Sequence, residues 1–461
     1  MPTAPLASGP TGPTHLRPLL DTVLTALHEG TAARPGPLPA GGPTAVTDHV
    51  RRTLGDPLPE HGTGDEEALA TVVRLLAEGA ADPADPLCAA HLHCPPLAVA
   101  TAADLAASAL NPSMDSWDQA PAASTLETLV TDALADLVHP GLRPTATALV
   151  TTGATESNHL ALLLAREHHA PAPLQLVTGD NAHHSLQRAA WLLGMPEPVT
   201  VPTPTGTLDP AALNETLVEL STDTVLVAAT AGTTDAGHID PLPALADVCE
   251  HHGARLHVDA AYGGTLLFSD RRRHLLQGLD RAQTVSLDLH KLGWQPVAAG
   301  LLSVRDPRET RTLAHHADYL NADDDTRAGL PDLLDRSLRT TRRPDILKIA
   351  TTLRALGRTG IGELVDQVCD LASEFARTVD SHPRFELYAR PTLSTVLFRP
   401  HHLSDPHIAK IRLNLLTGGH AVLGRAHLGG RLWLKATLLN PHTRPGDLAG
   451  LLKLVEGHTS R

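Results

Sequence analysis

The first lysine in the chain, Lys291, lies in the stretch VSLDLHKLGW at residues 285–294. Every permanently charged basic side chain before it is an arginine. A lysine amine loses its proton when it is desolvated and can then form a Schiff base, whereas a guanidinium cannot. The alternating apolar and polar residues before Lys291 predict a β-strand that ends near the amine. A surface lysine would also fit this single residue, so the rest of the chain has to decide between the two interpretations.

The composition indicates a globular protein with a large core. Of its 461 residues, 42% are hydrophobic and 19% are charged, which is typical of a long, compact chain. The net charge of −14 argues against nucleic acid or an anionic membrane as a partner, and it is compatible with a small cationic substrate.

Targeting signals and metal motifs are not apparent in the sequence. The first residues lack the basic and apolar regions of a secretory signal, and the apolar runs are far shorter than a membrane span. The four cysteines are too scattered for a disulfide framework. The 28 histidines lack the spacing of HExxH or CxxC sites, so no metal centre is expected. We therefore expect a cytoplasmic protein without a metal.

Between about residues 100 and 305, short apolar segments alternate with amphipathic ones. Strands are expected at 146–151, 223–230 and 255–258, and helices at 156–168 and 242–251. Such repeats predict a mostly parallel sheet with helices on both faces, which binds ligands at the carboxyl ends of its strands. Further helices are expected at 16–27, 65–81, 344–356 and 362–379, before a C-terminal region of mixed strands and helices.

Three groups lie where such a sheet would bind a ligand. The turn TGAT at 152–155 joins a strand to a helix and offers backbone N–H groups to a phosphate, although many strand–helix turns look alike. Asp259 ends another strand, where a carboxylate can hold a heterocyclic nitrogen protonated or simply cap a helix. Together with Lys291, which would hold an aldehyde, these groups outline a site for pyridoxal phosphate.

Eight motifs extend this pattern over about residues 88–445. They are HLHCPP (91–96), NPSMDSWDQ (111–119), TGATESN (152–158), AGTT (231–234), HVDAAYGG (257–264), DLHK (288–291), SLRTTRR (337–343) and LKATLLNP (434–441). In these motifs and in their order, the chain resembles the pyridoxal-phosphate-dependent group II amino-acid decarboxylases. The resemblance is strongest to the branch that contains the L-2,4-diaminobutyrate decarboxylases and the lysine decarboxylases of siderophore biosynthesis.

The resemblance implies an α/β protein of the fold-type I transferase-like class. Its mostly parallel seven-stranded sheet would have flanking helices, with an N-terminal helical segment and a small C-terminal α+β domain. The implied boundaries are 1–90 for the helical segment that wraps a partner subunit, 91–340 for the large cofactor-binding domain and 341–461 for the small domain. A homodimer with its active sites at the interface is implied as well.

The resemblance also assigns roles to residues around pyridoxal 5'-phosphate. Lys291 would hold the cofactor and return a proton to the product, Asp259 would pair with the pyridine nitrogen, and His183 would stack on the ring. The remaining implied contacts are with the ring and its hydroxyl (Thr234 and Ala261) and with the phosphate (Ala154, Thr155, Asp288 and His290).

Two positions depart from better-known group II enzymes. Lys435 stands where glutamate and aromatic-amino-acid decarboxylases have an arginine near the substrate carboxylate. The loop PDLLD at 331–335 lacks the tyrosine with which aromatic-amino-acid decarboxylases protonate their intermediate. Either another acid such as His93 replaces it, or the intermediate reacts with oxygen. Decarboxylation-dependent oxidative deamination therefore stays open, as do transamination, aldol cleavage and a non-catalytic scaffold.

The branch preference for ω-amino acids implies a basic amino-acid substrate, namely 2,4-diaminobutyrate, ornithine or lysine, in siderophore or other specialised metabolism. A distal ammonium would need a carboxylate partner. Asp115, Asp118 and the acidic run at 323–325 are candidates, although each could equally brace a loop or face solvent.

Overall fold

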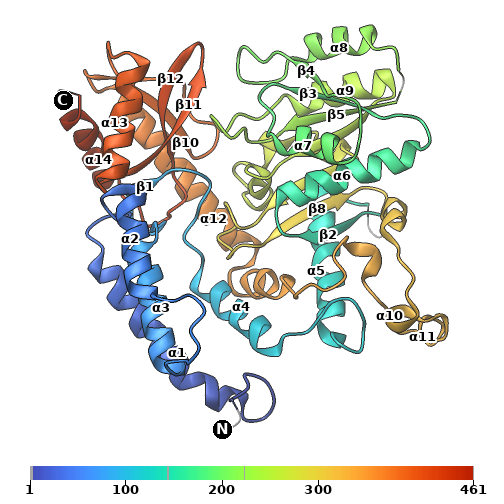
Figure 1. Cartoon of the computed structure of the whole chain (residues 1–461). Helices are drawn as coiled ribbons and strands as arrows, with labels where there is room; N and C mark the ends of the chain where they lie inside the picture. The colour runs from blue at the N-terminus through green and yellow to red at the C-terminus, as the bar shows by residue number, and fades with distance from the viewer. Residues whose placement is uncertain (1–3, 143–144, 223, 460–461) are drawn as a thin grey trace. The chain divides into compact units, whose positions relative to one another are not determined.

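The computed structural model describes residues 4–142, 145–222 and 224–459 and divides into two compact units (Figure 1). We call Pro96–Asp370 with Pro391–Thr395 the sheet unit. The terminal unit comprises Met1–Pro95, Leu371–Arg390 and Val396–Arg461. The two ends of the chain therefore fold together, with the sheet unit inserted between them in sequence.

A seven-stranded sheet in the order β2-β8-β7-β6-β5-β3-β4 forms the centre of the sheet unit. Its strands are β2 Thr147–Thr151, β3 Gln175–Gly179, β4 Val199–Val201, β5 Val225–Thr230, β6 Arg255–Asp259, β7 Thr284–Asp288 and β8 Gly300–Val304. Only β8 runs antiparallel to its neighbours, β2 and β7. The prediction of a mostly parallel seven-stranded sheet is confirmed.

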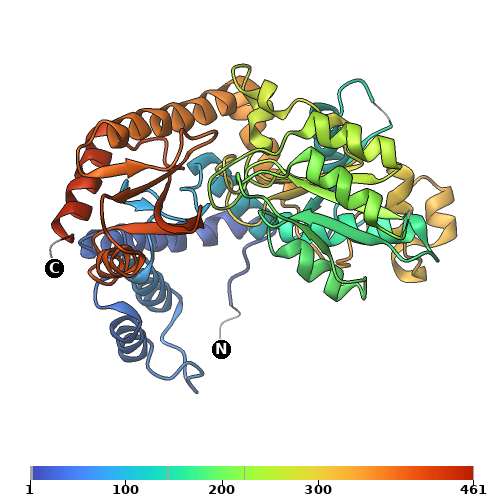
Figure 2. The same ribbon diagram turned by 90° about the horizontal axis from the view of Figure 1, so that it is seen from above.

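Helices flank this sheet on both faces, so that every residue of β2, β5, β6, β7 and β8 is buried (Figure 2). The helices are α4 Ala98–Leu110, α5 Pro121–Val138, α6 Ala154–His169, α7 Ser185–Leu192, α8 Pro210–Glu219, α9 Leu242–His252, α10 Asp318–Asn321 and α11 Asp323–Arg327. Short 3-10 turns lie at Gly264–Phe268, Arg273–Leu276, Leu279–Arg281, Pro307–Leu313 and Leu334–Arg336. The helices and strands expected between 146 and 258 are confirmed within two residues, except that position 223 lies outside the described residues.

A smaller sheet, in the order β1-β11-β12-β10-β9, organises the terminal unit. Its strands are β1 Cys88–Ala89, β9 Phe385–Leu387, β10 Thr395–Pro400, β11 Val422–Leu428 and β12 Arg431–Thr437. The helices are α1 Gly12–Ala33, α2 Gly42–Leu54, α3 Asp65–Gly79, α13 Asp405–Thr417 and α14 Pro445–Gly457. Because β1 pairs in parallel with β11, the N-terminal helices lead directly into the C-terminal sheet.

The helix α2 was not expected from the sequence. The Gly- and Pro-rich stretch near residue 42 begins α2, because a proline in the first turn of a helix has no backbone N–H to lose. The two helices expected at 344–356 and 362–379 are confirmed as the two parts of α12 Ile346–Asp380, which meet at the non-helical Gly357, whose φ is 65°. The C-terminal part of α12, in orange in Figure 2, packs on the small sheet through Phe375 and Val379. Among the described helices, none is long and apolar enough to cross a membrane.

Candidate active site

The carboxyl ends of β6 and β7 bring Asp259 and Asp288 to one edge of the large sheet. These two strands are parallel neighbours, and each aspartate is the last residue of its strand. His290 and Lys291 follow β7 directly. The turn between β2 and α6 reaches the same edge, because Ala154 at the start of α6 donates a hydrogen bond to Asp288. The sheet therefore assembles the three groups expected at strand ends.

Lys291 lies against Asp288. Its Nζ is 2.9 Å from Asp288 Oδ2, and the lysine side chain is 19% exposed whereas that of the aspartate is 3% exposed. Asp288 Oδ1 accepts the hydrogen bond from the Ala154 N–H at 2.7 Å. One carboxylate thus fixes both the amine and the N-terminus of α6.

The first turn of α6 has the chemistry of an anion site. Its leading N–H groups have no acceptor within the helix, and the helix dipole adds positive potential there. Gly153 precedes the helix, and a Cβ at this position would lie 3.1 Å from His290 Cε1. Glycine at this position lets the turn approach His290 closely. Helix N–H groups beside a histidine fit a phosphate group.

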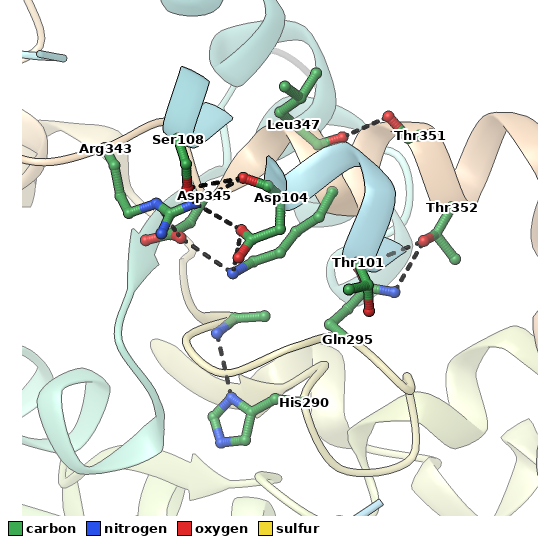
Figure 3. Close-up of polar contacts among 12 residues, drawn as sticks. Thr101, Asp104, Ser108, His290, Gln295, Arg343, Asp345, Leu347, Thr351 and Thr352 are labelled. Atoms are coloured by element: carbon green, nitrogen blue, oxygen red, sulfur yellow. Dashed lines mark hydrogen bonds and ion pairs between the residues drawn. The ribbon is translucent and has the colours of Figure 1, made fainter. Parts of the chain in front are cut away.

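His290 is held as a neutral ring. Its Nδ1 accepts a hydrogen bond from the Ala299 N–H at 3.2 Å (Figure 3). The proton of the neutral ring therefore resides on Nε2, which lies 3.6 Å from Asp288 Oδ2. Burial lowers the pKa of His290, with Asp288 opposing the shift. His290 thus offers an N–H donor at the phosphate end of the cluster.

Asp259 is buried and receives three hydrogen bonds. The donors are Asn158 Nδ2 at 2.8 Å, the Ala261 N–H at 3.1 Å and Ser286 Oγ at 3.3 Å. These donors fix both oxygens of the carboxylate. A fixed carboxylate at this depth suits pairing with a protonated heterocyclic nitrogen.

His183, just before α7, belongs to the same cluster. Its Nδ1 lies 2.8 Å from Ser185 Oγ and accepts a longer hydrogen bond, 3.3 Å, from the Ser185 N–H. Burial lowers the pKa of His183; Asp259 opposes this shift, whereas Lys291 adds to it. Because Asp259 and Lys291 both affect its pKa, His183 lies near the two residues with which the family resemblance groups it.

Two buried residues of this cluster received no role from the sequence. Asn158 in α6 and His257 in β6 are both fully buried, and they contact each other at 3.0 Å between Asn158 Oδ1 and His257 Nε2. Burial lowers the pKa of His257 to about 4. The only signal in the sequence was a polar residue inside an otherwise apolar strand or helix face.

The other predicted residues lie in different places. Ala261 is buried beside Asp259, whereas Thr155 is exposed in the first turn of α6 and Thr234 is exposed in the turn after β5. Asp115 is buried, and its carboxylate accepts a hydrogen bond from Gln119 Nε2 at 2.7 Å. Asp118 and the run at 323–325 are exposed.

His93 and Lys435 belong to the terminal unit. There, burial lowers the pKa of His91, and Lys435, Arg412 and His93 lower it further. The two predicted residues thus contribute to one basic cluster within that unit, with Lys435 in β12.

The loop without a tyrosine is anchored by leucines. Leu333 and Leu334 are buried, and Leu333 packs against Met114 and Ala120. In the part of the chain that the structure describes, no group of three or more His, Cys, Asp or Glu side chains is arranged to hold a metal.

The segment after Lys291 is hydrogen-bonded to α12. Gln295 Nε2 donates to Thr352 Oγ1 at 3.0 Å (Figure 3). The Gln295 backbone N–H donates to the Leu289 carbonyl at 3.0 Å. One turn earlier in α12, the amine of Lys348 is buried between Asp104 and Asp345, at 3.1 Å from each. The Gln295 contacts tie the segment that follows Lys291 to α12.

Comparisons with known proteins agree with this arrangement. A family model described as the pyridoxal-dependent decarboxylase conserved domain matches residues 48–401. An L-2,4-diaminobutyrate decarboxylase of Rhizobium meliloti (strain 1021) is 40% identical over 420 residues, which cover 88% of this chain and 84% of that protein. An L-2,4-diaminobutyrate decarboxylase of Acinetobacter baumannii is 31% identical over 437 residues, with coverages of 87% and 85%.

A solved structure extends the similarity to the fold. The glutamate decarboxylase domain of diaminobutyrate-pyruvate transaminase and L-2,4-diaminobutyrate decarboxylase from Vibrio parahaemolyticus superimposes with a TM-score of 0.87. It is 30% identical in sequence, and the match covers 99% of this chain and 97% of that one.

Proposed function

Because this chain belongs to the pyridoxal-dependent decarboxylase family, we propose that it removes the α-carboxylate of a basic L-amino acid and releases the diamine. The protein is a pyridoxal-phosphate-dependent amino-acid decarboxylase. Our first choice of substrate is 2,4-diaminobutyrate, followed by ornithine and lysine. The observation that carries this choice is the 40% identity to an L-2,4-diaminobutyrate decarboxylase over 88% of the chain.

The residues at the strand ends fit the cofactor. When bound, pyridoxal phosphate supplies an electron sink for the electrons left behind by carbon dioxide. We propose that Asp259 faces its ring nitrogen and that the first turn of α6, with Ala154 and Thr155, holds its phosphate, with Asp288 and His290 around it. The leading N–H groups of α6 and the Nε2–H of His290 support the phosphate assignment. The buried, hydrogen-bonded carboxylate of Asp259 supports the nitrogen assignment.

We propose the following roles for the remaining predicted residues. His183 covers one face of the ring, and Thr234 and Ala261 contact the ring and its hydroxyl. His93, Asp115 and Lys435 are proposed to bind substrate. The support is the motif match for the other five residues and, for His183, the electrostatic coupling to Asp259 and Lys291.

Lys291 is the amine that can react. It is 19% exposed, whereas the Lys348 amine is 1% exposed and lies between two carboxylates. Asp288 holds the Lys291 amine while it is charged, and the amine has to lose its proton before it attacks a carbonyl. Once the substrate amine had displaced it from the cofactor, the Lys291 amine would be free to take up a proton and return it to the product.

Protonation of the product decides between two outcomes. No tyrosine is present at 331–335, where buried leucines stand instead. We propose that Lys291, or His93 as the second candidate, supplies the proton, so that decarboxylation runs to the amine. The relatives named as decarboxylases favour this outcome over oxidative deamination.

We further propose a cytoplasmic homodimer with its active sites at the interface, in which residues 1–90 wrap the partner. The support is a set of exposed apolar side chains on this segment, among them Leu24 at 64% and Leu76 at 71%. Light scattering should give twice the chain mass of 48.7 kDa, and a fully active monomer would refute the dimer. A role in siderophore or other specialised metabolism is proposed on resemblance alone.

A product assay tests the main proposal. The cofactor-loaded enzyme is incubated with 2,4-diaminobutyrate, ornithine, lysine, glutamate and aromatic amino acids, with and without oxygen, and the products are identified by mass spectrometry. We expect a diamine in equal amounts under both conditions and the highest rate with 2,4-diaminobutyrate. A carbonyl product and peroxide that form only with oxygen would refute simple decarboxylation, and turnover of acidic or aromatic substrates alone would refute the substrate class.

A further inference from the structure

A continuous chain of buried hydrogen bonds joins Asp259 to His183 through Asn158. Asn158 lies in α6, one turn after the phosphate cradle, and is fully buried. Its side chain contacts Asp259, Ser185 and His257. It therefore lies between the carboxylate proposed to face the cofactor nitrogen and the histidine proposed to stack on the ring.

The chemistry of the partners fixes how the Asn158 amide is oriented. The Asp259 carboxylate can only accept, so the atom 2.8 Å from it must be the amide nitrogen. The second hydrogen on this nitrogen points to Ser185 Oγ at 2.9 Å. The amide oxygen then faces His257 Nε2 at 3.0 Å, and this nitrogen has to be the donor.

The orientation of the amide determines the tautomers of both histidines. His257 is neutral because burial lowers its pKa to about 4, so a proton on Nε2 leaves Nδ1 as an acceptor for Thr284 Oγ1 at 2.9 Å. Ser185 Oγ already accepts from Asn158, and its own hydrogen is free to point to His183 Nδ1 at 2.8 Å. Nδ1 also accepts the Ser185 N–H, so neutral His183 carries its proton on Nε2 as well.

On the basis of the function proposed above, we infer that Asn158 is a positioning residue that couples Asp259 to His183. It holds the Asp259 carboxylate in place, and through Ser185 it restricts His183 to the tautomer with its proton on Nε2. The ring then presents Nε2–H as its only donor. An amide is suited to this position because it donates twice and accepts once in a fixed plane.

Two variants separate the two halves of this coupling. Ser185→Ala removes the hydroxyl that His183 accepts from and leaves the contact between Asn158 and Asp259 intact. Asn158→Ala removes the contact with Asp259 and the hydrogen bond that orients the Ser185 hydroxyl, while the hydroxyl itself stays. The exposed Ser381 provides the matched control, Ser381→Ala. Because Ser185→Ala removes a single hydroxyl, it keeps the idea testable even if Asn158→Ala does not fold.

Nitrogen-15 NMR of histidine-labelled, cofactor-free protein reads the tautomers without any catalysis. The signals of His183 and His257 are assigned by their loss in His183→Gln and His257→Gln. We expect a proton on Nε2 for both rings in the wild type and the control. We expect a mixture of tautomers for His183 in Ser185→Ala, and for both histidines in Asn158→Ala. A wild-type His183 with its proton on Nδ1, or unchanged tautomers in both variants, would overturn the inference.

Titration of the cofactor-free proteins with pyridoxal phosphate gives the second measurement. Asn158→Ala should bind it about tenfold more weakly, because a hydrogen bond to a buried carboxylate is lost. Ser185→Ala should stay within about threefold of the wild type. Wild-type affinity in Asn158→Ala would refute its role toward Asp259. If the product assay failed for every amino acid while the tautomers were as expected, the proposed function would fall and the coupling would stand.

Discussion

A single methyl group at Gly300 should displace the turn at 152–154, which we propose as the phosphate cradle of the cofactor. Gly300 begins β8, where it pairs with Thr151 on one side and with Asp288 on the other. A Cβ at this position would lie 2.4 Å from Gly153 Cα and 2.5 Å from both Gly153 N and Thr151 Oγ1. Ordinary van der Waals contact begins at 3.4 Å. The Gly300→Ala variant therefore has to move the backbone before α6 by about 1 Å, because backbone atoms inside a sheet cannot rotate away.

A shift of this size should weaken the binding of the cofactor. Misplacement of a binding group by about 1 Å can cost about 100-fold, which corresponds to about 2.7 kcal/mol. The overpacked sheet should also lose about 1–3 kcal/mol of stability. We expect Gly300→Ala to bind pyridoxal phosphate about 100-fold more weakly than the wild type.

The assay is a titration of cofactor-free protein with pyridoxal phosphate, followed by visible absorbance and tryptophan fluorescence. Gly450→Ala in α14 is the matched control, because a Cβ there meets no atom within 4 Å. The control should bind like the wild type. A Gly300→Ala variant whose affinity is within twofold of the wild type would refute the idea that β8 constrains the cradle.

Three further perturbations should give measurable results. Lys291→Ala should abolish turnover and the visible absorbance of the bound cofactor, whereas the exposed Lys410→Ala should keep both; surviving turnover would contradict the proposed role. Glu127→Ala leaves the Arg342 guanidinium charged and without its ion-pair partner, at a place where both side chains are at most 1% exposed. The free energy of unfolding measured in urea should fall by about 3–5 kcal/mol. A fall of less than about 1 kcal/mol would argue against a buried ion pair. Burial lowers the pKa of His257 to about 4 in the folded protein, so the unfolded state binds more protons below pH 6.5. The His257 contribution to the free energy of unfolding should therefore fall by about 1.4 kcal/mol per pH unit as the pH drops from 6.5 to 4. His257→Gln should lose this contribution, which urea unfolding at pH 7 and 5.5 measures; an unchanged pH dependence would mean that His257 is already charged.

Much of the architecture was predictable because burial leaves a periodic pattern in the sequence. The apolar runs that became β2, β5 and β6 were recognised within two residues, as were α6 and α9. The helix α2 was missed because a Gly-Pro pair is typical of loops and also of the first turn of a helix. The interruption of α12 at Gly357 was anticipated as two separate helices.

The sequence assigned a role to some residues of the candidate site and none to others. Lys291, Asp259 and the turn before Ala154 were recognised because each carries a chemical group at the end of a predicted strand. Asn158 and His257 were quoted within motifs without a role. Their importance follows from contacts with residues as far as 101 positions away, which no local pattern specifies.

The sequence by itself determined the strand and helix alternation, the chemical groups at the strand ends and the family. These properties follow from side-chain identity and hydrophobic period, which are local. Only the tertiary structure decided that β8 lies antiparallel between β2 and β7 and that Gly300 therefore touches the phosphate cradle. Only it decided which buried polar groups satisfy one another around Asn158. Hydrogen-bond partners between distant segments depend on how the whole chain closes its sheet, because a buried donor must find its acceptor wherever packing brings one.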